Sequence, residues 1–241
     1  MTSSAAQLTS TDPEFDPSRI IVALDVPTLA EAEALIAHLT PTARHFKIGH
    51  HLQFLGGLDL ARQLASDGYD VFLDTKLHDI PNTVAGGIAA IADMGVGFVT
   101  VHAYPQTMEA AVQAAEGSDL KILAVSVLTS MGNDDLADAG YSLTVDEAIA
   151  RRAQQARDAG VHGLVCSPAD LSLVRQTVGT DLQTVTPGVR PADAEKGDQK
   201  RVATPAAAIS DGADYLVIGR PIVKADDPLS SFEAILASLN P

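Results

Sequence analysis

The chain has 241 residues, 46% of them hydrophobic, so it can bury a substantial core within one domain. Aromatic residues make up only 4% and tryptophan is absent, so the predicted core consists mainly of Ala, Val, Leu and Ile. The formal net charge of −15 argues against nucleic acid or an anionic membrane as a partner. No apolar run approaches the ~18 residues that a membrane span requires.

Residues 1–18 are rich in Ser, Thr, Ala and Asp, and they lack the basic start and apolar stretch of a signal peptide. We expect a disordered N-terminal tail there and a single folded domain over residues 19–241. Cys166 is the single cysteine, which excludes an internal disulfide and fits a reducing cytosol, so a cytoplasmic protein is predicted. It falls in an apolar run, which indicates a buried thiol and not a nucleophile.

Short runs rich in apolar and β-branched residues recur along the chain and predict strands. There are eight of them: Ile20–Leu24, His45–Ile48, Asp70–Leu73, Phe98–His102, Lys121–Val127, Gly163–Cys166, Thr184–Thr186 and Tyr215–Ile218.

Segments with helical periodicity lie between these runs. The first opens with a capping-box pattern at Thr28 and Glu31 and extends to Leu39. The others are Leu58–Ala65, Val84–Met94, Val145–Ala159, Ala169–Val178, Ala206–Asp211 and Pro228–Leu239.

The alternation of strands and helices implies right-handed βαβ units and a parallel sheet, which places the chain in the α/β class. Eight such units in about 220 residues favour a closed (β/α)₈ TIM barrel over an open doubly wound sheet. No GxGxxG pattern follows the first predicted strand, so a dinucleotide-binding fold has little support.

The ten residues from Asp74 to Thr83 (Asp-Thr-Lys-Leu-His-Asp-Ile-Pro-Asn-Thr) follow the third predicted strand. Side chains alternate along a strand, so Asp74 and Lys76 point the same way, whereas Asp79 falls where Pro81 takes the chain out of the strand. Interleaved opposite charges allow all three groups to stay ionised at a buried strand end. The triplet is therefore either a structural salt bridge or a device that holds an ammonium against a reacting centre.

In such a barrel the site lies at the carboxyl ends of the strands, and polar residues gather there. Lys47 is unusual because it lies inside an apolar strand; it either reaches solvent along the sheet edge or pairs with Asp25 and Asp74. The predicted site residues at this end are Asp25, Lys47, Asp74, Lys76, Thr129, Ser130, Arg190, Gly219 and Arg220.

The loops after the seventh and eighth strands are where barrels of this type commonly bind phosphate. Their glycines let backbone N–H groups approach an anion, and Arg190 and Arg220 add guanidinium groups that bind it bidentately. The polar run Ala192–Arg201 is either a solvated loop or a lid with Gln199 reaching toward the ligand.

The seven histidines do not suggest a metal site. His50 and His51 are adjacent, and no His-x-x-x-His pair is present. His102 ends the fourth strand as a single polar residue. We predict no metal.

Together these segments resemble the orotidine 5′-phosphate decarboxylase family, from Ile20 to about Leu239. The matching motifs are Ala-Leu-Asp25, Phe-Lys47-Ile-Gly, Asp74-x-Lys76-x-x-Asp79-Ile-Pro-Asn-Thr83, Leu-Thr129-Ser130, Pro-Gly-Val-Arg190-Pro, Asp-Gln199-x-Arg-Val and Gly219-Arg220-Pro-Ile.

The resemblance implies conversion of orotidine 5′-phosphate to UMP and CO₂ in pyrimidine biosynthesis, without a metal or cofactor. The lysine matching Lys76 stabilises the carbanion at C6 and then protonates it. Lys47, Asp74 and Asp79 match the other members of an alternating charge network.

Further contacts follow from the same resemblance. The positions of Asp25 and Lys47 hold the ribose hydroxyls, and those of Thr129 and Ser130 lie by the pyrimidine. The positions of Asp79 and Thr83 reach into a neighbouring subunit's site, which implies a homodimer. The phosphate contacts are those of Arg190, Gln199, Gly219 and Arg220.

Two alternatives remain at this stage. One is a metal-dependent sugar-phosphate decarboxylase or hexulose-phosphate synthase of the same superfamily, which shares the Asp-x-Lys-x-x-Asp pattern. Those enzymes bind Mg²⁺ through an acidic residue on the second strand, where this chain has Lys47. The other is a non-catalytic barrel that binds a phosphorylated ligand, which would not need the alternating charges.

Overall fold

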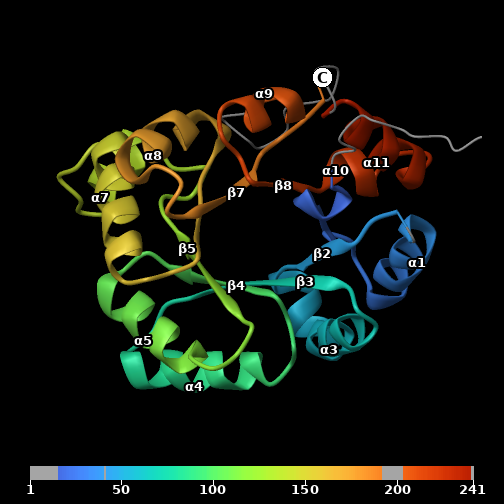
Figure 1. The fold of residues 1–241 in the computed structure, drawn as a ribbon, viewed down its shortest axis with the longest axis horizontal. Helices are drawn as coiled ribbons and strands as arrows, with labels where there is room; N and C mark the ends of the chain where they lie inside the picture. The colour runs from blue at the N-terminus through green and yellow to red at the C-terminus, as the bar shows by residue number, and fades with distance from the viewer. Residues whose placement is uncertain (1–15, 41, 192–202, 240–241) are drawn as a thin grey trace, which may run out of the picture.

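The computed structural model describes residues 16–40, 42–191 and 203–239. Its parallel strands pair in chain order, and β8 pairs with β1, so the sheet closes into a barrel (Figure 1). This confirms the predicted (β/α)₈ architecture. The strands are β1 (Ile20–Ala23), β2 (His45–Ile48), β3 (Asp70–Leu77), β4 (Phe98–His102), β5 (Lys121–Val125), β6 (Gly163–Val165), β7 (Gln183–Pro187) and β8 (Tyr215–Ile218).

Helices surround the barrel and follow one another around it in chain order (Figure 1). The longer ones are α1 (Leu29–Leu39), α3 (Leu58–Ser66), α4 (Pro81–Ala92), α5 (Pro105–Ala115), α7 (Val145–Asp158), α8 (Leu171–Val178) and α11 (Pro228–Ala237). Shorter helical segments are η1 (Pro17–Arg19), α2 (His50–Leu52), η2 (Gln53–Gly57), α6 (Asn133–Asp138), η3 (Pro168–Asp170), α9 (Pro205–Ser210) and α10 (Arg220–Val223). Within the described part of the chain, every helix is too short or too polar to cross a lipid bilayer.

Helix α5 is absent from the sequence-based prediction. Its buried positions are Thr107, Met108, Ala111 and Ala115, so small and polar side chains make up most of the face that packs inward. The helix is less apolar overall than α1 and α4, so the segment stands out less as a hydrophobic pattern in the sequence.

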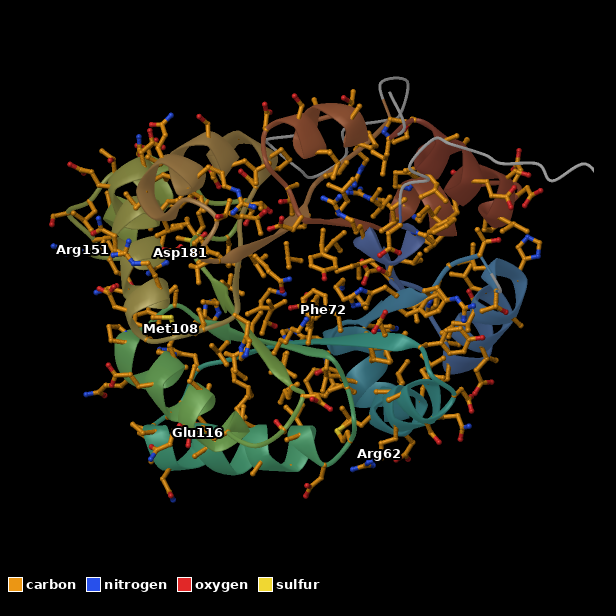
Figure 2. The ribbon with its side chains drawn as sticks, in the orientation of Figure 1. Arg62, Phe72, Met108, Glu116, Arg151 and Asp181 are labelled. Atoms are coloured by element: carbon orange, nitrogen blue, oxygen red, sulfur yellow. The ribbon has the colours of Figure 1, made fainter. Side chains whose placement is uncertain are left out.

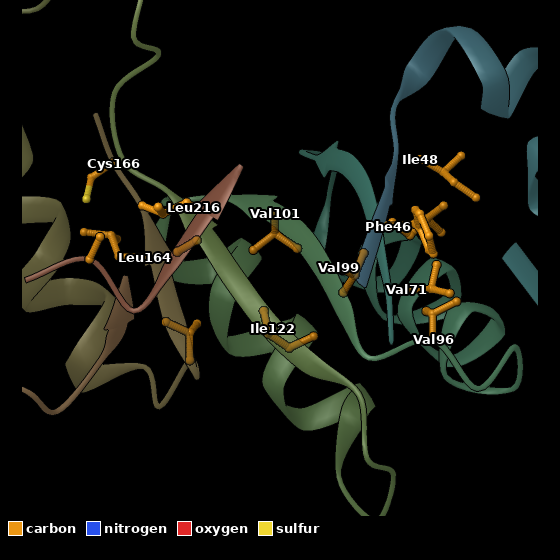
Figure 3. Close-up of a cluster of buried hydrophobic side chains, with 14 of the residues drawn as sticks. Phe46, Ile48, Val71, Val96, Val99, Val101, Ile122, Leu164, Cys166 and Leu216 are labelled. Carbon is orange, nitrogen blue, oxygen red and sulfur yellow. The ribbon is translucent and has the colours of Figure 1, made fainter. Parts of the chain in front are cut away.

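The core has two layers because side chains alternate across the sheet. Phe72, Phe98, Leu123 and Val185 belong to the cluster inside the barrel, and Phe72 lies near its centre in Figure 2. The neighbouring residues along the strands pack outward against the helices. Figure 3 shows part of this outer layer, which includes Phe46, Ile48, Val71, Val99, Val101 and Leu164.

Cys166 lies in the outer layer and is buried, as the sequence predicts (Figure 3). Burial raises the pKa of its thiol to about 12. The thiolate needed for nucleophilic chemistry is therefore scarce at neutral pH.

The short helix η1 precedes β1 at the amino-terminal end of the barrel strands. Asp16 caps this 3-10 helix by accepting a hydrogen bond from the Ser18 N–H at 2.9 Å. Arg19 donates to the carbonyls of Asp214 and Ala213 at 2.7 and 3.1 Å, which ties the start of the domain to the residues just before β8. The rest of the predicted tail, residues 1–15, lies outside the described residues.

Candidate active site

A cavity of about 420 Å³ opens at the carboxyl ends of the strands, where the sequence places the site. The strand alternation explains its lining. Because Phe72 points into the barrel, Asp74, two residues later on the same strand, also points inward, and Lys76 lines the same cavity. The predicted residues that line the cavity are Asp25, Lys47, Asp74, Lys76, Thr129, Arg190, Gly219 and Arg220.

Four of these side chains form a row of alternating charge. The Lys47 ammonium lies 3.4 Å from Oδ1 of Asp25 and 3.6 Å from Oδ2 of Asp74. The Lys76 ammonium lies 2.7 Å from Oδ1 of Asp74. Lys47 is only 8% exposed, so it does not reach solvent but pairs with the two carboxylates.

Asp74 is the centre of this row, and two effects on its carboxyl oppose each other. Burial alone raises the pKa of Asp74, but the charges of Lys47 and Lys76 and the hydrogen bonds from Lys76 and Thr100 lower it by more. The pKa of Asp74 therefore lies below its usual range, and the carboxylate is ionised at neutral pH.

The backbone at Lys76 is unusual. Its φ of 48° makes it the one non-glycine residue in the left-handed region among the described residues. The pairing of β3 with β4 is irregular here, since Leu73 pairs with Val99 and Leu77 with Val101. Three residues of β3 thus face one of β4, and the resulting bulge turns the Lys76 side chain into the cavity.

Thr100 of β4 supports this bulge and was missed by the sequence analysis. Its Oγ1 accepts a hydrogen bond from the Lys76 N–H at 2.9 Å and donates one to Oδ1 of Asp74 at 2.8 Å. The Thr75 hydroxyl donates to the Thr100 carbonyl at 2.9 Å. The side chain of Thr100 is fully buried, so this one residue fixes both the backbone and the side chains of the charged row.

Cations outnumber carboxylates in the cavity lining. Among the described lining residues, two carboxylates, Asp25 and Asp74, stand against five cations: Lys47, Lys76, Arg190, Arg220 and Lys224. A protein with a net charge of −15 thus presents a locally cationic cavity, which suits an anionic ligand.

Lys224 was not among the predicted site residues. It lies four positions after Arg220, which begins the short helix α10, and Lys224 directly follows that helix, so the two residues share one side of a helical turn. The sequence does contain a signal for Lys224: it lies at position i+4 from Arg220, which was itself predicted to bind phosphate.

A model of the family described as Orotidine 5'-phosphate decarboxylase / HUMPS family matches residues 18–235. The chain belongs to this family. A relative from Bradyrhizobium sp. (strain ORS 278) named orotidine 5′-phosphate decarboxylase is 55% identical over 221 residues, which cover 92% of this chain and 91% of the relative. One of the same name from Afipia carboxidovorans is 56% identical over 221 residues, covering 92% and 94%.

Solved structures agree with these relatives. The crystal structure of orotidine 5′-phosphate decarboxylase from Lactobacillus acidophilus aligns with a TM-score of 0.82 and 35% identity, covering 92% of this chain and 99% of that one. An uncharacterized conserved protein from Geobacillus kaustophilus aligns with a TM-score of 0.80 and 32% identity.

Of the predicted site residues that the structure describes, three do not line the cavity of their own chain. Asp79 and Thr83 are exposed, and the Asp79 carboxylate accepts a hydrogen bond from the Ile80 N–H at 2.7 Å. Ser130 is exposed beside Thr129, which does line the cavity.

Gln199, the remaining family residue predicted at the phosphate, lies outside the described residues, as does the predicted lid Ala192–Arg201. Arg190, which precedes this segment, is buried, and its guanidinium donates a hydrogen bond to the Val189 carbonyl at 2.8 Å.

The histidines have other roles within the described residues. His50 contacts the Thr75 carbonyl at 2.9 Å, and His51 contacts the Pro27 carbonyl at 3.0 Å. No group of three His, Cys, Asp or Glu side chains in the described part of the chain is arranged to hold a metal ion.

Proposed function

We propose that this chain decarboxylates orotidine 5′-phosphate to UMP and CO₂ in pyrimidine biosynthesis. The observation that carries the proposal is the Lys76 ammonium, held 2.7 Å from the Asp74 carboxylate in a cavity that also contains Arg190 and Arg220. The names of the relatives from Bradyrhizobium and Afipia support it.

The chemistry requires a cation at the reacting carbon. Loss of CO₂ leaves a carbanion at C6 of the pyrimidine, where no adjacent carbonyl accepts the charge, so fixed electrostatics must stabilise it. At ~4 Å and an effective dielectric constant near 20, an ammonium contributes roughly 4 kcal/mol. In this proposal Lys76 supplies that charge and then donates its proton to C6.

The other residues bind and orient the substrate. Arg190, Arg220 and the Gly219 backbone take the phosphate, together with Gln199. Asp25 and Lys47 take the ribose hydroxyls, and Thr129 and Ser130 lie by the pyrimidine. Asp74 holds Lys76 in place through the 2.7 Å contact. Binding energy from the phosphate then serves to orient the ring at Lys76.

Lys47 argues against the metal-dependent sugar-phosphate enzyme. Its ammonium lies within 3.6 Å of both Asp25 and Asp74, so it occupies the position from which a divalent cation would contact these carboxylates. A second positive charge there would be repelled.

The proposed active form is a homodimer in which Asp79 and Thr83 complete the partner's site. Both are exposed and do not line the cavity of their own chain. The neighbouring Ile80 is 67% exposed and Phe54 is 86% exposed, and large apolar side chains this open to water are typical of a surface that a partner covers. A cytoplasmic location belongs to the same proposal and fits the single buried cysteine.

The proposal is tested by adding orotidine 5′-phosphate to the protein after exhaustive chelation and following the loss of orotate absorbance. We expect turnover at the same rate with and without EDTA. Activity that returns only when Mg²⁺ is added would favour the sugar-phosphate enzyme. Binding without turnover would favour the non-catalytic barrel.

A further inference from the structure

Arg152 of α7 lies outside the cavity but contacts the loop that forms one of its walls. Its guanidinium donates a hydrogen bond to the Ser126 carbonyl, directly after β5. The same guanidinium lies 5.3 Å from the ring centre of Tyr104 and 5.6 Å from that of Tyr141. Because cation–π contacts act at about this range, one group binds two rings and one loop.

Two further contacts extend this arrangement to His78, which directly follows β3, the strand that carries Lys76. The hydroxyls of Tyr104 and Tyr141 are hydrogen-bonded. The Tyr104 ring also stacks on His78, with ring centres 4.2 Å apart and an angle of 23° between the planes. We call His78, Tyr104, Tyr141 and Arg152 the Arg152 cluster.

The Arg152 cluster joins separate loops at the mouth of the cavity. Ser126 is followed by Val127, Leu128 and Thr129, which line the cavity. His78 lies two residues after Lys76, which also lines it. Tyr104 follows β4, the strand that carries Thr100. A shift of the Arg152 side chain would thus displace the loop after β5 and the residues next to Lys76.

We propose that Arg152 is a positioning residue for the reaction, one that holds the loop containing Thr129 against the end of β3, which carries Lys76. This rests on the proposed function, because the loop after β5 carries the residues assigned to the pyrimidine and β3 carries the residue assigned to C6. Arg152 acts through Ser126 and Tyr104 and touches no substrate itself. Catalysis depends steeply on the distance between reacting groups, so loosening this contact slows turnover.

The shape of arginine suits this position. A planar guanidinium stacks on aromatic rings and donates in its own plane at the same time. The ammonium of lysine retains the charge but not this combination. The adjacent Arg151 is exposed on the outer side of α7 and serves as a matched control (Figure 2).

The test compares Arg152→Met with Arg151→Met by steady-state kinetics on orotidine 5′-phosphate. We expect Arg152→Met to lower kcat at least about tenfold, with Arg151→Met unchanged. Ribose 5-phosphate, a probe for the phosphate end of the cavity, should bind the Arg152→Met variant within about twofold of the parent protein. Guanidinium ion at millimolar concentration should restore part of the activity of an Arg152→Ala variant and have no such effect on the parent protein.

Equal kcat values for the two methionine variants would overturn the proposal. So would an equal loss of ribose 5-phosphate affinity and kcat, since that indicates general disruption. If Arg152→Met does not fold, Arg152→Lys decides: a kcat equal to that of the parent protein contradicts the proposal, and a kcat reduced at least about threefold with an unchanged melting temperature supports it. If the parent protein itself has no activity on orotidine 5′-phosphate, the proposed function is refuted. That outcome is distinct from a failure of the Arg152 proposal, which requires an active parent protein and an equally active Arg152→Met variant.

Discussion

A single hydroxyl, that of Thr100, contacts both members of the Asp74–Lys76 pair. It accepts from the Lys76 N–H and donates to the Asp74 carboxylate. The sequence could not reveal this role, because a threonine in the run Phe98–His102 has the β-branched shape expected of any strand residue. The charges of Asp74 and Lys76 were predictable from their spacing, whereas the support beneath them depends on the register between β3 and β4.

We predict that Thr100→Val lowers both stability and activity. Valine keeps the shape but leaves the buried Lys76 N–H without its acceptor, which costs about 1–3 kcal/mol. We expect urea unfolding to show that loss and kcat/KM to fall by about tenfold or more. Thr100→Ser, which keeps the hydroxyl, should retain most of both, and a Thr100→Val variant as active as the parent protein would show that the bulge does not depend on this contact.

His45 should make stability depend on pH. Its side chain is 3% exposed, and burial lowers its pKa from 6.5 to about 4, partly offset by Asp70. The unfolded chain therefore binds more protons than the folded one between pH 6.5 and 4. The free energy of unfolding should fall as the pH is lowered through this window, by about 3 kcal/mol in total from this residue.

Chemical denaturation between pH 7 and 4.5 measures this dependence. His45→Gln removes the titrating group and keeps a donor for the Ser18 carbonyl, which His45 contacts at 3.1 Å. The dependence should become shallower in this variant and stay unchanged in His51→Gln, whose side chain is exposed. Equal slopes in all three proteins would refute the assignment to His45.

At the scale of the elements, the positions of the strands were predictable and their ends were not. The apolar run ends at Leu73, yet β3 continues to Leu77. Hydrogen bonds of the Thr75 and Thr100 hydroxyls hold this extension, and the polar residues after Leu73 do not predict them. Helix α5 escaped prediction because its buried face is mostly small or polar. The capping box at Thr28 was predictable, since it depends only on residues three apart, and Thr28 Oγ1 does accept from the Glu31 N–H at 3.2 Å.

Two glycines test the packing of these elements in opposite directions. A Cβ on Gly163 of β6 would lie 2.7 Å from the Gln183 carbonyl oxygen and 2.9 Å from Cδ2 of Leu123. Gly163→Ala should therefore destabilise the protein by about 1–3 kcal/mol. Gly86 lies in α4 with open space at its Cβ position, so Gly86→Ala should stabilise by about 0.5–1 kcal/mol. Thermal unfolding of both variants measures the difference, and a shift of the same sign in both would contradict this packing.

At the scale of the whole molecule, the barrel brings together residues from all along the chain. Asp25 and Arg220 lie at opposite ends of the sequence, and both line the cavity because β1 pairs with β8. The order of the strands is enough to bring these residues together. Most of the cavity lining could therefore be predicted from the sequence once the barrel fold had been predicted. The positions of Asp79 and Thr83 relative to a second subunit are not fixed by one chain, and they stay a prediction.

The shared site can be tested by mixing two inactive variants, Lys76→Ala and Asp79→Ala, under conditions that let subunits exchange. In a mixed dimer one site carries both lesions and the other carries neither, so we expect activity to return at up to roughly half of the sites of each mixed dimer. Mass labelling confirms the exchange. A mixture that exchanges and stays inactive would place Asp79 in the site of its own chain.

The central claim is that the Lys76 ammonium performs the decarboxylation, and Lys76→Ala tests it most directly. The measurement is kcat on orotidine 5′-phosphate, with circular dichroism and ribose 5-phosphate affinity recorded on the same sample. Since one group serves as charge stabiliser and proton donor, we predict a loss of kcat greater than about a hundredfold, with the fold and the phosphate affinity retained. A folded Lys76→Ala variant that keeps more than about a hundredth of the parent activity would contradict the account.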